Sequence, residues 1–498
     1  MHRSTLGIVH QLVVGLTVAG LFVVAIEAVQ SAGATWNLHH VDDDGNFSIH
    51  LRDGADRLKV KSRGKIVYEN ERRIASLEAG ARLRIEERLD GIDRLLVVTP
   101  QSDGAPSYDY RVDGDAKTFD AAAETWFSGV VLRLYRRAGV DADGRARRLA
   151  TQGGLPALLD EVAMIPGDEV AARYLAVAVE LAEPGDLAAV LDRAAESLDS
   201  DYYLYRTLGQ ATAADLRHAD VRTAFRHGAD KMSSDYHLRR LLGDVLDDAA
   251  EPAPEVTEML FQTAQHGLRS GHEIAELILQ LAEARRRAGS PDASLPTALD
   301  PVLRSISSDH HLQRAVDALM SPLPSSDEDR ARLLDGVSRI SSNYHAAEIL
   351  ISFAHRLAET EDGTRTLPEP GFRILERIRS SHDAARAADA LAQVLEAAQV
   401  PRLLDAVHVQ GDYHKRVVLE SVLERHGRTV ADTPAFRRIL ESMNDYEREQ
   451  VVELLSTAKA GEPVAPPHTG QDDETGTGPE ATEATEATET TPSVADAI

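Results

Sequence analysis

The sequence predicts an α-dominated α+β protein, in which a small antiparallel β domain precedes an α-solenoid of about nine helical pairs. Two observations support this prediction, and a third concerns the N-terminal segment. A phrase of the Ser-Ser-Asp-Tyr-His type recurs along most of the chain, with helical patterns on both sides of it. Residues 36–116 alternate apolar and polar side chains, as strands do. Residues 1–34 contain a long uncharged apolar run.

The repeated phrase is clearest at residues 232–237, 306–311 and 340–345. We take its Asp or Asn as the anchor of each copy. A period in the range of 31 to 38 residues is typical of stacked helical repeats of the HEAT or TPR kind. The anchors, with Gly or Ser in two of them, are Asp168, Asp201, Asp235, Gly271, Asp309, Asn343, Ser381, Asp412 and Asp445.

Each copy carries the residues that start a helix. The Ser, Gly or Asp residues before the anchor can cap free N–H groups. The anchor carboxylate is expected in the first turn, where the helix dipole favours negative charge. Apolar residues then follow three, six, seven and ten positions later, as Leu238, Leu241, Leu242 and Val245 do. A second helical pattern precedes each anchor, so each repeat is a helix pair that must stack on its neighbours to bury its apolar face.

The pattern changes divide the chain into five segments. They are a signal peptide or transmembrane anchor at 1–34, a small β domain of five or six strands at 36–116, a helical junction at 117–160, the solenoid at 161–456, and a disordered acidic low-complexity tail at 457–498. The junction helix carries Trp126 and Phe127, which are expected to pack the sheet onto the first repeat.

The N-terminal segment predicts export. Arg3 precedes an apolar run that, counted from Leu6 to Ile26, is long enough for the ~20 residues of a membrane span. Ala32-Gly33-Ala34 is also a possible cleavage site for a signal peptide. Both alternatives place the rest of the chain outside the cytoplasm, either anchored by a single span with its N-terminus inside or released into the periplasm or beyond.

Composition narrows the possible functions. The chain has 54 basic and 81 acidic residues and a net charge of −27, which argues against a nucleic-acid partner. It has no cysteine, which excludes disulfides, thiolate metal sites and cysteine nucleophiles. The stretch from His272 to Glu276 resembles a zinc-protease helix but lacks the second histidine. No cofactor, metal site or catalytic residue is expected.

Two groups of residues are candidates for interaction. The first is a ladder along one edge of the stack, at the two positions after the anchor: Tyr236, His237, His310, His311, Tyr344, His345, Tyr413 and His414. These side chains could bridge adjacent helix pairs, or sense pH. At a helix spacing of ~8–10 Å, residues one repeat apart are expected to be too distant to share a metal ion.

The second group is a run of alternating cations, formed by Arg57, Lys59, Lys61, Arg63 and Lys65. This strand could face anionic lipid headgroups near the anchor. The alternative is a solvated strand face that discourages edge-to-edge pairing of sheets.

A family resemblance rests on these same motifs. The β segment with LRIEER, LLVV and YDYRV, the Trp-bearing helix and the SSDYH repeats together resemble exported regions of uncharacterised bacterial envelope proteins. Similar repeats follow the peptidase part of antirepressor-type metallopeptidase receptors. The resemblance covers about residues 45–455 and implies an exported, helical-repeat protein. The peptidase part, with its membrane spans and HExxH helix, has no counterpart here, so no catalytic residue is carried over.

We therefore expect a non-enzymatic interaction module of the bacterial envelope, which binds a protein or peptide on the solenoid surface and reaches the membrane through its N-terminal segment. One alternative is an envelope hydrolase with its site at the junction between the β domain and the solenoid. Another is a structural spacer that presents the acidic tail.

Overall fold

The computed structural model describes residues 34–41, 46–69, 73–183, 185–248, 253–289, 294–360, 365–407 and 411–457. The expected signal or anchor and the expected acidic tail lie outside these residues, except that Ala34 begins the first strand and Thr457 ends the last helix. Among the described helices, none combines the length and the apolar character needed to cross a membrane.

The N-terminal part is an antiparallel seven-stranded sheet with the order β1-β2-β3-β6-β7-β8-β9, accompanied by the hairpin β4–β5. Its strands are β1 (Ala34–Val41), β2 (Phe47–Asp53), β3 (Asp56–Arg63), β4 (Ile66–Glu69), β5 (Arg73–Leu77), β6 (Arg82–Leu89), β7 (Ile92–Pro100), β8 (Pro106–Val112) and β9 (Asp115–Lys117). Asp90 and Gly91 join β6 to β7, and both residues have positive φ, as a tight hairpin requires. The sheet is larger than the expected five or six strands, because short strands such as β9 leave too brief an alternation to recognise.

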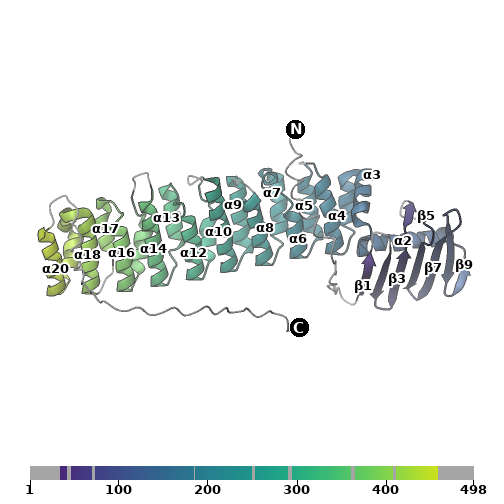
Figure 1. Ribbon diagram of the computed structural model, residues 1–498, viewed down its shortest axis with the longest axis horizontal. Helices are drawn as coiled ribbons and strands as arrows, with labels where there is room; N and C mark the ends of the chain where they lie inside the picture. Colours follow the sequence, from purple (N-terminus) through teal and green to yellow (C-terminus); the bar gives the residue numbers. More distant parts are fainter. Residues whose placement is uncertain are drawn as a thin grey trace, which may run out of the picture.

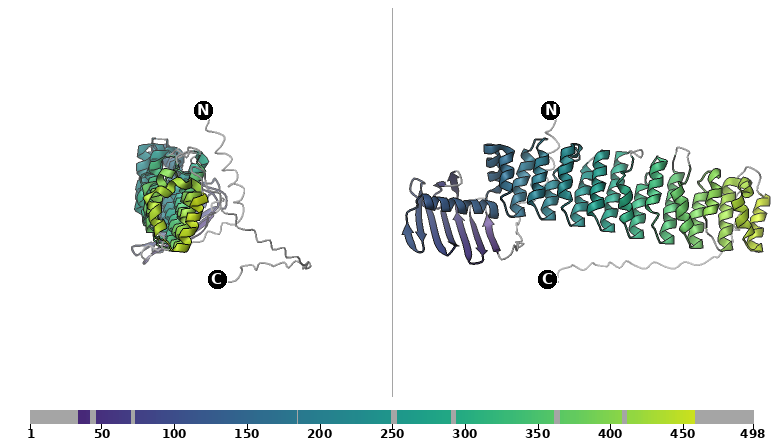
Figure 2. Two further views of the ribbon diagram at one scale, coloured as in Figure 1. Left: turned by 90° about the vertical axis from the view of Figure 1, so that its left-hand side faces the viewer. Right: turned by 180° about the vertical axis from the view of Figure 1, so that it is seen from behind.

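Helix α2 (Ala121–Ala138) covers one face of this sheet (Figure 2). Asp120 caps its first turn by accepting hydrogen bonds from the N–H groups of Ala122 and Ala123. Phe127 is fully buried against the sheet, and Trp126 donates a hydrogen bond to the buried carboxylate of Glu87. These aromatic residues belong to the core of the sheet and not to that of the first repeat, which corrects their expected bridging role.

The described part of the solenoid contains nine helix pairs, and so confirms the predicted fold class. The first helices of the pairs are α3 (Ala142–Val162), α5 (Leu187–Ser197), α7 (Ala219–Ala229), α9 (Pro254–Gly267), α11 (Leu299–Ser305), α13 (Asp327–Gly336), α15 (Glu369–Arg377), α17 (Val400–Ala406) and α19 (Pro434–Glu441). The second helices are α4 (Asp168–Leu181), α6 (Asp201–Leu208), α8 (Asp235–Asp248), α10 (Gly271–Ala288), α12 (Asp309–Leu319), α14 (Asn343–Ala358), α16 (Ser381–Ala392), α18 (Asp412–His426) and α20 (Asp445–Thr457).

The pairs stack into an elongated rod with the sheet at one end (Figure 1). First helices contact first helices of the next pair, and second helices contact second helices, which gives two layers. A single apolar core runs between the layers from Ala142 to Val451, separate from the core of the sheet. This is the arrangement in which each pair buries its apolar face only against its neighbours.

Every second helix begins at the residue identified as an anchor. The serine before the anchor caps several of them: Ser270, Ser308, Ser342 and Ser380 each accept a hydrogen bond from a first-turn N–H. The anchor carboxylate has a further role that the sequence did not reveal. It reaches across to the next repeat and accepts hydrogen bonds from the turn that precedes the next second helix.

Candidate interaction surface along the turns

The turns between the two helices of each pair form one edge of the rod, and this edge carries a row of exposed rings. Eight of the nine anchors are followed directly by an aromatic residue, which we call the outer ring: Tyr202, Tyr236, His272, His310, Tyr344, His382, Tyr413 and Tyr446. All eight are exposed. In the described part of the chain, five of the nine large hydrophobic side chains that are exposed are tyrosines of this row. Tyrosine is enriched at protein interfaces because it offers a large apolar surface with a polar tip.

The residue after each outer ring lies deeper and links consecutive repeats. His237 contacts the ring of Tyr202 in the preceding repeat, with 6.3 Å between ring centroids, and its own neighbour Tyr236 at 5.3 Å. The same step recurs as His272–His311 at 5.4 Å, His310–His345 at 6.2 Å and His382–His414 at 6.1 Å. The ladder residues therefore contact one another across repeats along this edge.

Where the residue after the outer ring is a glutamate, an arginine of the preceding repeat makes the contact between repeats. Arg239 lies 5.7 Å from the ring centroid of Tyr236, and its Nε is 3.0 Å from the carboxylate of Glu273 in the next repeat. Arg416 does the same between Tyr413 and Glu447. A cation over an aromatic face is attracted to the ring, so these arginines hold the tyrosines in place while leaving their outer faces exposed.

Four imidazole rings form a cluster in the middle of the row, those of His272, His310, His311 and His345. Burial, and then the proximity of His272 and His310, lower the pKa of His311. Its Nδ1 is buried and has no hydrogen-bond partner among the described residues. Among those residues, no three histidine, aspartate or glutamate side chains converge so that they could hold a metal ion.

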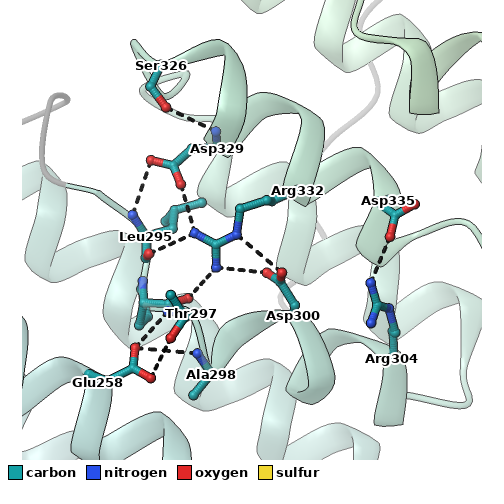
Figure 3. Close-up of polar contacts among 11 residues, drawn as sticks. Glu258, Leu295, Thr297, Ala298, Asp300, Arg304, Ser326, Asp329, Arg332 and Asp335 are labelled. Atoms are coloured by element: carbon teal, nitrogen blue, oxygen red, sulfur yellow. Dashed lines mark hydrogen bonds and ion pairs between the residues drawn. The ribbon is translucent and has the colours of Figure 1, made fainter.

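The opposite edge of the rod, where one pair leads into the next, is tied together by internal polar contacts (Figure 3). Arg332 donates two hydrogen bonds to the carboxylate of Asp300 and one to Asp329, and it also reaches the carbonyl oxygens of Leu295 and Pro296. These described groups satisfy one another's hydrogen-bonding capacity, whereas the rings of the turn edge face solvent.

The cationic run lies on β3 in the interior of the sheet and not at its edge, so protection of an edge does not explain it. Arg57, Lys61 and Arg63 are exposed, and Lys59 is half-buried. Lys65 lies beyond the end of β3, in the loop to β4. The flanking strands β2 and β6 add further cations to the same face, which the sequence pattern alone did not reveal.

The junction between sheet and solenoid holds carboxylates that are paired with arginine. Glu161 lies 2.7 Å from Nε of Arg136 and 2.6 Å from Nη1 of Arg145. Burial opposes its ionisation, but the two arginines hold the pKa of Glu161 below its usual value. Glu87 is paired with Arg133 in the same way. These contacts fix α2 to α3 and to the sheet.

Comparisons with known proteins identify no family. No protein-family model and no curated protein matches the chain. Among solved structures, one similar chain comes from computationally designed self-assembling cyclic homo-oligomers. It is 14% identical, with a TM-score of 0.13, and the match covers 61% of this chain and 99% of that chain. A likeness at this TM-score carries no argument about fold or function.

Proposed function

We propose that this chain is a non-enzymatic interaction module of the bacterial envelope, which binds a protein or peptide along the row of outer rings. The observation that carries the proposal is the concentration of exposed tyrosines on one edge, each at the same position of its repeat. Exposed apolar surface gathered in one place marks an interaction site more often than the same residues scattered singly.

The spacing of the row favours an extended polypeptide as the ligand. Consecutive outer rings belong to helices that pack side by side, at ~8–10 Å. An extended or polyproline-type chain rises ~3.1–3.4 Å per residue, so about three ligand residues would span one repeat. Four or five rungs would then bind a segment of about twelve to fifteen residues. Apolar or proline side chains of such a segment would pack on the tyrosine faces, while its polar groups would meet imidazole and arginine.

Location is the second part of the proposal. It rests on the apolar run of residues 1–34, which predicts export with or without a retained membrane anchor. The hydrolase alternative gains no support at the junction, because a carboxylate held ionised by two arginines is a poor general acid. We therefore propose a single function.

The test is a crosslinking pull-down from native envelopes with the full chain and with a chain shortened after Ser456. A Tyr236→Ser/Tyr344→Ser variant removes two outer rings, and a Val67→Ser/Leu181→Ser variant changes two residues that are also exposed but lie away from the turn edge. We expect one dominant partner with both chain lengths, lost in the tyrosine variant and retained in the control. Loss on removing residues 457–498 would instead favour the spacer alternative, and no enriched partner would contradict the proposal.

A further inference from the structure

The face of the sheet turned away from α2 is strongly cationic. Strand alternation directs residues such as Val60, Ile85 and Leu96 into the core beneath α2, and directs their neighbours outward. The outward cations are Arg52, Arg57, Lys59, Lys61, Arg63, Arg82, Arg84, Arg88 and Arg111. The outward carboxylates on the same strands are Glu86, Asp93 and Asp109. Nine cations against three carboxylates stand out in a chain whose net charge is −27.

The strand register places these cations directly opposite one another. Lys61 pairs with Arg84 and Arg63 with Arg82 across β3 and β6, whereas Arg57 lies between cations on both neighbouring strands. Side chains directly opposite in antiparallel strands are neighbours, and like charges there destabilise the sheet. The fold thus carries an electrostatic cost on this face.

Each of the three carboxylates on the face pairs with a cation, Asp109 with Arg111 at 3.2 Å, and these pairs offset only part of that cost. Arg84 hydrogen-bonds Glu86 and lowers the pKa of that carboxyl, with smaller contributions from nearby Lys59 and Lys61. Asp93 is shared by two arginines at 3.8 and 3.9 Å. No carboxylate of the described residues lies within ion-pair distance of Lys61, Arg63 or Arg82. A ligand that supplies negative charge would relieve this cost.

We propose that this open sheet face docks on a membrane surface rich in anionic lipid. The cations occupy adjacent strands ~4.8 Å apart and so form a two-dimensional grid, which matches a planar layer of headgroups better than a single linear chain. Basic clusters close to a membrane are attracted by the negative surface potential of anionic lipids. The acidic remainder of the chain is repelled by the same surface, which leaves the sheet as the part that docks.

The position of the sheet in the chain agrees with this occupant. The expected membrane segment ends at Ile26, and β1 begins at Ala34. Eight steps of at most ~3.6 Å keep the start of the sheet within roughly 30 Å of the membrane. This part of the argument rests on the membrane location proposed above, whereas the charge pattern does not.

The absence of native cysteine allows a single dye to test the docking. Thr99 is exposed on the same face at the end of β7, so a dye at Thr99→Cys reports contact with lipid. The full chain is placed in nanodiscs of phosphatidylcholine, alone or with about one-third phosphatidylglycerol, together with a headgroup-labelled quenching lipid. We expect strong quenching only with phosphatidylglycerol, and its loss at high salt.

Two charge variants make the result specific. Lys61→Glu/Arg63→Glu should reduce the docked population at least about tenfold in the phosphatidylglycerol discs. The control Arg217→Glu/Arg428→Glu makes the same charge change at exposed positions of the solenoid and should leave quenching unchanged. Circular dichroism would show that the first variant still folds. Equal quenching in neutral and anionic discs, or in both variants, would overturn the proposal.

Two further outcomes distinguish membrane docking of the sheet from the anchor question and from binding of the acidic tail. A chain that does not enter nanodiscs would favour a cleaved signal over a retained anchor, and the same dye with added phosphatidylglycerol vesicles would still test the face. Dye protection in lipid-free solution that disappears when residues 458–498 are removed would identify the acidic tail of the chain as the occupant, and would overturn membrane docking. Neither outcome bears on the row of outer rings.

Discussion

Asp309 and Ser341 lie at equivalent turns of consecutive repeats, and the Asp309 carboxylate accepts hydrogen bonds from both the backbone N–H and the hydroxyl of Ser341, at 3.2 and 2.8 Å. It also accepts one from the N–H of Ser342 at 2.8 Å. Asp201 repeats the arrangement with Ser233 and Ser234. The anchor therefore holds two repeats in register. Ser342 both caps its own helix, by accepting a hydrogen bond from the N–H of His345, and donates its N–H to the Asp309 carboxylate.

Removing the Asp309 carboxylate should destabilise the contact between repeats. Asp309→Ala leaves N–H groups of the next turn without their acceptor, at an expected cost of ~1–3 kcal/mol in the free energy of unfolding. Asp309→Asn should cost less, because Asn343 at the equivalent anchor still accepts one backbone hydrogen bond. Urea unfolding measures the difference, and hydrogen exchange at Ser341 and Ser342 localises it. Glu328→Ala, which removes an exposed first-turn carboxylate, should cost only a few tenths of a kcal/mol.

A second prediction concerns the stability of variants at Arg332. Arg332→Ala removes the cation that is paired with the buried carboxylate of Asp329. This change should lower the free energy of unfolding by ~3–5 kcal/mol. Arg332→Lys restores the charge but not the planar fork that reaches Asp300 and two carbonyl oxygens, so it should recover only part of the loss. The measurement is the free energy of unfolding in denaturant. Arg304→Ala breaks a half-exposed ion pair with Asp335 in the same region and should cost under about 1 kcal/mol; an equal cost would contradict the account.

The histidine cluster predicts a dependence of stability on pH. The pKa of His311 is lowered in the folded protein by burial and by His272 and His310. The unfolded chain therefore binds the proton more readily. The contribution to stability is complete above the ordinary pKa of 6.5 and is lost as the pH falls through the folded value. Unfolding measured at about pH 7.5 and about pH 5.5 should show a drop that shrinks in His311→Gln.

A matched control checks that this pH effect is local. His355 is exposed near the end of α14, and His355→Gln should keep the whole drop. The carboxylate of Glu161, whose folded pKa is also lowered, acts in a different window. Its stabilising effect is present above pH 4.5 and is lost as the pH falls further, so a drop confined to pH below 4.5 would contradict the assignment to His311.

The repeat architecture was predictable because its sequence signals lie close together along the chain. Each anchor is preceded by a capping residue and followed by an apolar stripe, so the start of α12 or α14 can be read within about ten residues. The reach from Asp309 to Ser341 could not be read, since it depends on how far one pair rotates against the next. The same applies to the cationic face. Its β3 half is visible as an alternation, but the contribution of Arg82 and Arg84 appears only when the register of β3 and β6 is known.

The row of outer rings was recognised as a ladder, and its residue types suggested contact along one edge. Helix spacing argued only against a shared metal ion, and it did not predict which rings would meet. Histidine side chains lean along the edge and close the gap, as the 5.4 Å between His272 and His311 illustrates. In other repeats an arginine–glutamate pair, such as Arg239 and Glu273, takes the place of the ring contact. This pairing could not be predicted from the sequence either, because the partners lie 34 residues apart.

The most direct test of the central proposal is site-specific photo-crosslinking in intact envelopes. A photoreactive residue replaces Tyr236 or Tyr344 on the row, or Val67 or Leu181 away from the turn edge, one position at a time. We expect the same partner peptide to crosslink from both row positions, at points about nine or more residues apart along the partner, and not from the other two. Equal crosslinking from all four positions, or none from the row, would contradict a ligand that lies along the outer rings.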